Sequence, residues 1–479
     1  MTVYVKPAAK KGHLLVRDVT VVDTADGSRT AHQDIVMNDG LIASIAATGA
    51  PAGDAAVVEG NGFFVIPGLV DSHAHPLNNP QVVEGAYALM LAAGVTGFRQ
   101  MAGSDRLIAD RAAGRLPVWS GAPALLATPG DLLTPLNAST EEQVRATVRH
   151  QKEVGADFVK SGLTTARIQL AALDEGRRVG IRIAGHLPAD LDPRLAAEAG
   201  MLSIEHLGPG PTVFAATATD EAEVRAMVAA SPAPALPKLT IPGMSFLIGR
   251  LLASLVVNPA TMTSPEGAHA LELADTHFDE ARARALARVF VQHDTWQCPT
   301  LIRVHTQQLP NEHLDDKRVR WMDPREVKRW RKSTKKYLGL PGHSREVLAS
   351  HWDTQLRLLR VFDEENVPLL AGTDACGAGW VIPGFALHDE FDLLARAGLS
   401  PLAILKSATS SPARFFGVAD VAGSVSPGCH ADLVLLGSDP IADHRALHDI
   451  TGVVREGAHW SRADLDGVLK RMEADPRAR

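Results

Sequence analysis

Between residues 62 and 419 the chain alternates short apolar runs with longer stretches that carry apolar residues at helical spacing. No tight two-residue hairpin separates neighbouring apolar runs, so consecutive strands need helical crossovers and are expected to run parallel. Eight such runs predict an α/β protein whose strands close into a (β/α)8 TIM barrel. The runs expected to form strands are residues 63–75, 94–102, 117–126, 155–162, 181–188, 201–208, 294–304 and 367–375.

The two ends of the chain follow a different pattern. Residues 13–48 alternate apolar and polar positions around two Asp-Gly pairs, which favour tight turns between antiparallel strands. Residues 422–460 show the same alternation. Because a closed barrel brings its ends together, we expect both segments to build one small β-sandwich domain. The predicted division is residues 1–64 and 420–479 for the small domain and residues 65–419 for the barrel.

One predicted helix has clear signals at both of its ends. Ser139 and Glu142 have the spacing of a capping box, in which each side chain bonds the backbone N–H of the other residue. Gly155 supplies a stop at the far end. We therefore expect a helix between residues 139 and 155.

Two insertions interrupt the barrel pattern. Residues 239–265 contain a single charge, Arg250, and prolines near both ends leave runs shorter than the ~18–20 residues of a spanning helix. Their apolar part, residues 239–257, is expected to form a lid or a subunit interface. Residues 317–337 hold ten Lys or Arg and two acids, mixed with aromatic residues. We expect a solvated helical insertion there.

Composition narrows the class of protein. The 479 residues include 46% hydrophobic and 22% charged residues, which argues against wholesale disorder. A net charge of −7 argues against a nucleic-acid partner. Three scattered cysteines suit neither a disulfide framework nor a Cys zinc site. Without a signal-peptide pattern at the N-terminus, we expect a cytoplasmic protein without membrane contact.

The predicted strands end in polar residues of one chemical kind. Because the carboxyl ends of barrel strands meet at one mouth, these side chains should face each other. Such a set is costly to bury unless it is paired, and a pair of divalent cations would resolve the cost. Neutral imidazoles and carboxylates are ligands of zinc, with iron, cobalt or manganese as alternatives. The residues are His73, His75, Lys160, His186, His206 and Asp374.

These motifs together resemble the metal-dependent amidohydrolase superfamily. The resemblance spans nearly the whole chain and is closest to the branch of imidazolonepropionase and prolidase-like dipeptidases. It rests on VIPGLVDSHAH at 65–75, GADFVKSG at 155–162, GHLP at 185–188, IEHLG at 204–208, AGTDA at 371–375, SPLAILKSATSSPARFFG at 400–417 and GSVSPGCHADLVLLGSDP at 423–440.

The resemblance implies a role for each polar residue at the mouth. His73, His75 and Asp374 would hold the more buried metal, and His186 with His206 the second. By its position in the family motif, Lys160 would be carbamylated and bridge both metals. The implied reaction is hydrolysis of a C–N bond next to a carbonyl. A hydroxide that bridges the metals would be the nucleophile, and Asp374 would carry its proton to the leaving nitrogen.

The substrate is less defined by the sequence. Candidate pocket residues follow the strand ends: Arg99 and Gln100, then Arg303 and His305. An Arg at the mouth would favour a substrate carboxylate, as in a dipeptide or an N-acyl amino acid. Many relatives have Asp where this chain has Gln100, so their specificity does not transfer directly. The apolar insertion favours a small neutral amide, urea or carbamate, and we take this substrate class as the first hypothesis.

Other protein classes fit less well. No G-x-S-x-G elbow, Walker A motif or Rossmann glycine motif is present in the sequence. A deaminase on the same scaffold would usually bind one metal and lack the bridging lysine, and a non-catalytic relative would have lost ligands. We therefore expect an enzyme with a small-molecule substrate that forms homo-oligomers.

Overall fold

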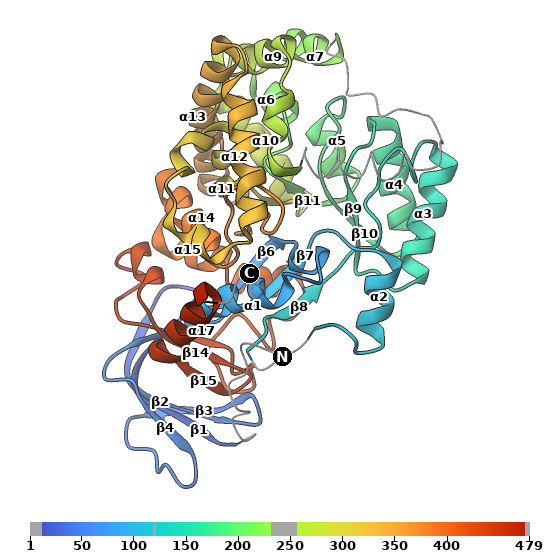
Figure 1. Cartoon of the computed structure of the whole chain (residues 1–479). Helices are drawn as coiled ribbons and strands as arrows, with labels where there is room; N and C mark the ends of the chain where they lie inside the picture. The colour runs from blue at the N-terminus through green and yellow to red at the C-terminus, as the bar shows by residue number, and fades with distance from the viewer. Residues whose placement is uncertain (1–11, 118–120, 231–255, 475–479) are drawn as a thin grey trace.

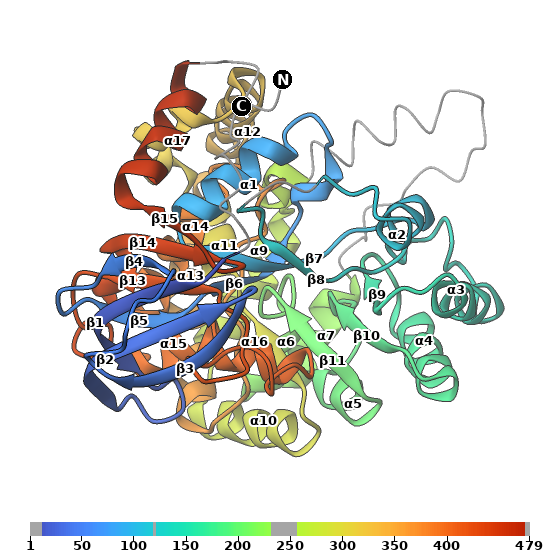
Figure 2. The same ribbon diagram turned by 90° about the horizontal axis from the view of Figure 1, so that it is seen from below.

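The computed structural model describes residues 12–117, 121–230 and 256–474 of the chain. Figures 1 and 2 show two parts that lie against each other, a small sheet made from both ends of the chain and a larger α/β part between them. The predicted α/β class is confirmed. Most of the apolar insertion, residues 239–255, lies outside the described residues, as do residues 118–120 of the third predicted strand.

The small sheet joins the two ends of the chain. The pair β2–β3 turns through Asp39 and Gly40, both with positive φ, as the Asp-Gly pattern predicts. β5 runs parallel to β1 and antiparallel to β13, and so links the N-terminal strands to the C-terminal ones. The strands are β1 (Leu14–Val22), β2 (Arg29–Asn38), β3 (Leu41–Ala47), β4 (Ala56–Glu59), β5 (Phe64–Pro67), β13 (Leu433–Leu436), β14 (Ile450–Arg455) and β15 (Ala458–Ser461).

Two details of the predicted small domain need correction. The described strands form one sheet in the order β15-β14-β13-β5-β1-β2-β3, with β4 paired to β1, whereas a sandwich would have two. The predicted boundary at residues 64 and 65 cuts through β5, whose four residues all belong to this sheet. The reason is that the apolar run 63–75 contains two strands, separated at Gly68. A run without polar interruption does not show where one strand ends and the next begins.

The sheet is anchored to the rest of the molecule through alternate residues of β13. Val434 and Leu436 belong to the large apolar core shared with the α/β part, and Leu433 and Leu435 belong to a second core within the small sheet. Successive side chains of a strand point to opposite faces, so one short strand contributes to both cores.

The larger part contains seven named strands that pair only in parallel. They fall into two sheets, β6-β7-β8 and β9-β10-β11-β12, as the crossover pattern predicts. They are β6 (Leu69–Ala74), β7 (Val95–Gln100), β8 (Ala124–Ala127), β9 (Phe158–Ser161), β10 (Arg182–Gly185), β11 (Met201–Glu205) and β12 (Trp296–Cys298).

Single parallel bridges connect these two sheets into a ring. Pro129 and Leu133, just after β8, pair with the two ends of β9. The eighth predicted strand is a segment without regular strand geometry, residues 368–375. It pairs with β12 through Leu369 and with β6 through Ala375. Eight parallel segments thus follow one another around a closed ring, which is the pairing that a (β/α)8 barrel requires.

Helices cover the outside of this ring, with α3 and α4 on one side and α10 to α14 on the other (Figure 1). The α-helices are α1 (Val83–Ala92), α2 (Asp105–Ala112), α3 (Glu141–Glu153), α4 (Ala166–Val179), α5 (Pro193–Glu198), α6 (Thr212–Thr217), α7 (Glu221–Ala230), α9 (Pro265–Thr276), α10 (Glu280–Gln292), α11 (Leu301–Gln308), α12 (Pro324–Leu338), α13 (Gly342–Glu364), α14 (Phe385–Arg396), α15 (Pro401–Ser407), α16 (Ser410–Phe415) and α17 (Arg462–Ala474). The 3-10 helices are η1 (Pro76–Asn78), η2 (Pro259–Met262), η3 (Pro310–His313), η4 (Lys317–Trp321) and η5 (His444–His448).

The basic insertion at 317–337 is helical, as predicted, and forms η4 and most of α12. Its aromatic residues Trp321, Trp330 and Tyr337 are buried. Among the described residues, no helix has both the length and the apolar character needed to cross a bilayer.

The cap of α3 lies one residue later than the sequence suggests. Thr140 is the N-cap, and its Oγ1 accepts a hydrogen bond from the backbone N–H of Gln143 at 3.1 Å. Gln143 in turn accepts from the backbone N–H of Ser139 at 2.8 Å. The box is therefore formed with Gln143 in place of Glu142, since Ser, Thr, Glu and Gln all suit these positions and the sequence offers two registers.

We expect Thr140→Ala to destabilise the first turn of α3 by about 1 kcal/mol, because the N–H of Gln143 loses its acceptor. Ser139→Ala keeps that cap and should have a smaller effect. Hydrogen exchange of the amides at residues 141–144 in both variants measures the difference. Equal loss of protection in the two variants would place the cap at Ser139 instead.

Candidate metal centre

His73 and His75 reach one space at the end of β6. His73 is the fifth residue of the strand and fully buried, and His75 follows directly after its end. The Nε2 atoms of His73 and His75 lie 3.2 and 2.8 Å from the same carboxylate oxygen, Oδ1 of Asp374. Asp374 comes from the eighth segment of the ring, which is bridged to β6 at Ala74 and Ala375. The strand pairing thus brings Asp374 to two histidines that lie about three hundred residues before it in the sequence.

The opposite side of the His73 ring is held by Glu205, the last residue of β11. His73 Nδ1 lies 2.6 Å from Glu205 Oε2, so the Nε2 atom of the ring is directed toward Asp374. Glu205 also accepts two hydrogen bonds from Arg99, at 2.9 and 3.1 Å, and one from Ser203 at 2.5 Å. A carboxylate behind a histidine is the usual outer support of a metal ligand, since it fixes the tautomer and orientation of the ring.

The sequence analysis did not include Glu205 among the site residues. In a regular strand, Glu205 and His206 would point to opposite faces, so a prediction that uses one of them passes over the other. The structure brings both inside because the chain leaves β11 at this point: His206 has a φ of 60° and Leu207 a φ of 55°. The signal that was available is a Glu directly before a predicted ligand, in IEHLG.

The other predicted ligands lie beside this group. The ring of His206 is 4.7 Å from that of His73 and 5.1 Å from that of His186, centroid to centroid. His206 Nδ1 lies 2.5 Å from Thr300 Oγ1, which supports the back of this ring as Glu205 supports His73. Lys160 Nζ is 3.4 Å from His73 Nε2. All six side chains predicted from the strand ends therefore lie at one mouth of the ring.

Burial shapes the protonation of these groups. It lowers the pKa of Lys160 to about 8, against the opposing influence of Glu205 and Asp374. It also holds the pKa values of His186 and His206 well below the ordinary histidine value; Lys160 and Arg303 lower the pKa of His186 further, and Arg303 and His73 that of His206. Both imidazoles are consequently neutral at pH 7, the form in which histidine binds a metal.

Asp374 is the most heavily engaged carboxylate at the mouth. Its second oxygen, Oδ2, forms an ion pair with the guanidinium of Arg303 on α11. Burial acts to raise its pKa, yet Arg303 and the two histidines hold the pKa of Asp374 well below its usual range. The carboxylate is therefore ionised, with one oxygen toward the histidines and the other toward Arg303.

Arg99 and Gln100 were predicted to contact substrate, but both side chains are bound to other residues of the protein. Arg99 is fully buried, bound to Glu205, Ser203 and the carbonyl of Ser72, and packed against the ring of Phe415. The expectation that Arg99 contacts substrate is therefore replaced by a supporting role beneath His73. The reason is that β7 directs it across the ring toward β11, a direction that a single strand does not reveal.

Gln100 is likewise occupied by its neighbours. Its amide donates to Asn78 Oδ1 at 2.8 Å and to the carbonyl of Ala102 at 2.7 Å, and its oxygen accepts from the backbone N–H of Leu77. These bonds hold together the loops that follow β6 and β7. The expected contact of Gln100 with substrate is thus replaced by loop support.

Arg303 and His305 lie on α11, whereas they were predicted to follow directly after the seventh strand. β12 is only three residues long, and α11 begins at Leu301. Arg303 faces Asp374, but His305 points elsewhere, with its Nδ1 2.8 Å from His313 Nε2. Burial lowers the pKa of His305 to about 4. The structure therefore brings Arg303 to the mouth and leaves His305 in a separate buried pair.

Two groups of side chains among the described residues have the spacing of metal ligands. One is His73, His75 and Asp374, the predicted site of the more buried metal. The other is His73, Glu205 and Cys298. In the second group Glu205 is already paired with Arg99, whose positive charge opposes a cation there. The first group has ring nitrogens that face a common carboxylate, with a support behind His73, and this donor set fits a divalent cation.

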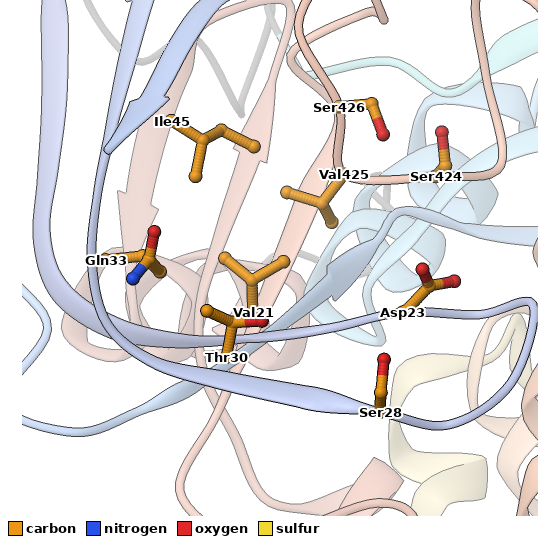
Figure 3. Close-up of a pocket in the computed structure, with 9 residues that line it drawn as sticks. All are labelled: Val21, Asp23, Ser28, Thr30, Gln33, Ile45, Ser424, Val425 and Ser426. Carbon is orange, nitrogen blue, oxygen red and sulfur yellow. The ribbon is translucent and has the colours of Figure 1, made fainter. Parts of the chain in front are cut away.

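A separate hollow in the small sheet contains none of the predicted site residues (Figure 3). It lies between β1, β2, β3 and the loop at 424–426. Its lining is a mixture of hydroxyl, amide, carboxylate and aliphatic side chains: Val21, Asp23, Ser28, Thr30, Gln33, Ile45, Ser424, Val425 and Ser426. Its lining has no imidazole and none of the six predicted metal ligands.

Comparison with known proteins agrees with this geometry. Residues 313–459 match the model of the amidohydrolase family. The solved structure of bottromycin amidohydrolase is similar over 97% of this chain and 91% of that one, with a TM-score of 0.68 and 24% identity. A Xaa-Pro dipeptidase solved with methionine in its active site is similar over 94% of this chain and 100% of that one, with a TM-score of 0.60 and 17% identity.

These two structures show that the chain shares their fold over nearly its whole length. In sequence, the chain is 38% identical over 65 residues to a D-hydantoinase of Streptomyces coelicolor (strain ATCC BAA-471 / A3(2) / M145). That match spans 13% of this chain and 13% of the length of the D-hydantoinase.

We expect Glu205→Gln to destabilise the protein by about 3–5 kcal/mol, because Arg99 would remain buried without its carboxylate. The variant should also bind metal roughly 10–100-fold more weakly, since His73 loses its support. Urea unfolding and metal titration measure the two effects.

The double variant Arg99→Met/Glu205→Gln is the matched control. It removes both charges, so it should recover much of the stability while metal binding stays weak. Wild-type metal affinity in either variant would contradict the supporting role of Glu205.

Proposed function

We propose that this protein is a metal-dependent amidohydrolase that hydrolyses the C–N bond next to a carbonyl in a small amide, urea or carbamate. The observation that carries the proposal is the meeting of His73, His75 and Asp374 around one space at the mouth of the ring. A purely structural core does not need four imidazoles, a lysine and a carboxylate at one mouth. The donor set of these side chains suits divalent cations.

His73, His75 and Asp374 would hold one cation, and His186 with His206 a second, with zinc as the first candidate. Bound cations of this kind polarise a carbonyl oxygen and lower the pKa of water so that it becomes a nucleophile at neutral pH. Glu205 and Thr300 keep the rings of His73 and His206 turned toward the mouth.

Lys160 is the residue that would link the two proposed cation sites. Its Nζ lies next to His73, and burial brings its pKa to about 8, so a neutral amine is accessible near physiological pH. A neutral lysine adds to carbon dioxide with formation of an N–C bond and release of one proton, giving a carbamate. That anion would offset the charge of the cations between the two pairs of histidines.

Asp374 is the group we assign to proton transfer. Its low pKa keeps it ionised, and it is close to both His73 and His75. As the water oxygen adds to the carbonyl carbon, Asp374 would accept the proton of the water. When the C–N bond breaks, Asp374 would deliver that proton to the leaving nitrogen. Arg303 holds the other carboxylate oxygen and so keeps Asp374 in place between transfers.

A second candidate function has one observation in its favour. Arg303 is a buried guanidinium next to Asp374, where it could pair with a substrate carboxylate. This would favour a dipeptidase or an N-acyl amino acid hydrolase, and a Xaa-Pro dipeptidase is among the proteins of similar fold. Arg303 is already paired with Asp374, so we retain the neutral substrate as the first choice.

Elemental analysis of protein purified without chelator should find about two divalent metal ions per chain. In Lys160→Ala we expect about one, with hydrolysis reduced by at least about 100-fold, since the anion between the cations is lost. Lys152→Ala, the same substitution at an exposed position on α3, is the control and should keep both properties. Two metals and normal turnover in Lys160→Ala would exclude its bridging role.

A panel of N-acyl amino acids, dipeptides, neutral amides, ureas and carbamates separates the two substrate classes. With neutral substrates as the true class, Arg303→Met should change kcat through Asp374 and leave KM little changed. If instead the substrate carboxylate binds Arg303, KM for N-acyl amino acids should rise about 100-fold while KM for neutral amides does not. Wild-type kcat/KM values across the panel give the preferred class directly.

A further inference from the structure

Helix α12 carries a concentrated positive charge that the hydrolytic site does not use. Seven Lys or Arg and one Glu lie between residues 324 and 338, in a chain whose net charge is −7. All seven basic residues are exposed, whereas Trp330, Thr334 and Tyr337 are buried. At 3.6 residues per turn the basic residues cover an arc of about 160° opposite the buried ones. They are Arg325, Lys328, Arg329, Arg331, Lys332, Lys335 and Lys336.

Most of this charge has no ion-pair partner among the residues that the structure describes. Arg325 pairs with Asp323, and Arg329 with Glu326. Among the described residues, none forms an ion pair with Lys328, Arg331, Lys332 or Lys335. These four cations are spread over two turns of one helix, which Figure 2 shows at the edge of the molecule. Such a row repels itself, so it is most stable against a surface of negative charge.

Apolar groups lie within and beside the same face. Val319, Met322, Pro324 and Val327 line a shallow hollow whose rim is formed by Lys328 and Arg331. Beyond the hollow, two large apolar side chains are exposed. Met262 is 50% exposed, with its Sδ 3.5 Å from Lys336 Nζ, and Leu338 at the end of α12 is 43% exposed. The face thus combines cations with apolar groups that water does not favour.

We propose that this face of α12 binds the surface of a membrane rich in anionic phospholipid, with head-group phosphates on the unpaired cations and acyl carbons against the hollow, Met262 and Leu338. A helix with a basic polar face and adjoining apolar side chains is suited to lie in the interface of an anionic bilayer. The attachment would be peripheral. It goes beyond the hydrolytic function proposed above, and beyond the solvated helix that the sequence alone predicts.

The buried aromatic residues argue against a nucleic acid as the partner. Single strands bind where bases stack on exposed aromatic rings, and Trp321, Trp330 and Tyr337 all face inward. The apolar hollow and the exposed Met262 and Leu338 would also have nothing to contact on a phosphate backbone. An acidic polypeptide remains the rival that the experiment must separate.

The test is co-sedimentation of the full-length, metal-loaded protein with vesicles of phosphatidylcholine alone or mixed with phosphatidylglycerol. We expect binding only to the mixed vesicles, and weaker binding as salt is raised. Failure to sediment with the mixed vesicles at low salt would overturn the proposal. So would retention by polyglutamate without binding to the mixed vesicles, which would assign the face to an acidic polypeptide. Neither outcome bears on the hydrolytic function.

A charge variant tests whether α12 is the binding face. The four substitutions Lys328→Gln, Arg331→Gln, Lys332→Gln and Lys335→Gln should lower the partition coefficient roughly fivefold for each cation removed. The matched control replaces four exposed arginines on the opposite side of the ring, Arg106, Arg167, Arg177 and Arg182, by Gln. Equal losses in both variants would show that net charge alone is responsible and would overturn the assignment to α12.

A second variant tests the apolar contribution. Met262→Ser with Leu338→Ser leaves every charge in place, so binding at low salt should change little. At high salt, where charges are screened, the variant should release from the vesicles before the wild type does. Indistinguishable release would remove the apolar groups from the proposal. Hydrolysis of a soluble substrate by all variants confirms that each is folded.

Discussion

The buried carboxylate of Glu205 is the group on which the interior of the ring depends. It accepts hydrogen bonds from Arg99, Ser203 and His73, and none of these side chains reaches bulk solvent. Burial alone would raise its pKa, but Arg99 and His73 hold the pKa of Glu205 well below its usual range. An ionised Glu205 requires the proton of His73 to sit on Nδ1, so the Nε2 lone pair faces the mouth. Glu205 therefore compensates the buried charge of Arg99, and it also sets the tautomer of His73, a proposed metal ligand.

Left-handed backbone at the mouth brings the remaining side chains together. His206, Thr300 and Asp374 all have φ between 45° and 64°, although none of them is glycine. Each stands where the chain leaves β11, β12 or the eighth segment of the ring. Such conformations cost about 1–3 kcal/mol each and persist only where the surroundings impose them. Here they turn adjacent residues, such as Glu205 and His206, into the same space, and allow Thr300 to meet the ring of His206.

The helix α11 connects this site to the surface. Its residue Arg303 pairs with Asp374, and the carbonyl of Gln308 at its end accepts a hydrogen bond from Tyr337 of α12 at 2.5 Å. Trp380, in the segment after Asp374, donates to Thr334 of α12 at 3.0 Å. The buried side of α12 thus packs on elements that carry residues of the proposed hydrolytic site. Contact of its basic side with an anionic surface would place the mouth of the ring at a defined distance from that surface.

The sequence by itself determined the α/β class, the parallel crossovers, the joining of the two chain ends and the six polar residues at the strand ends. Each of these depends on local periodicity or on a short motif, such as the His-x-His at 73–75. Tertiary structure decided which way each side chain points across the ring. Arg99 lies beneath His73 and not in the pocket, Glu205 supports a ligand, and His305 turns away from Asp374. These directions follow from the twist of the strands, the positive φ angles at their ends and the pairing of buried charges. All three are properties of the closed ring, and no single segment contains them.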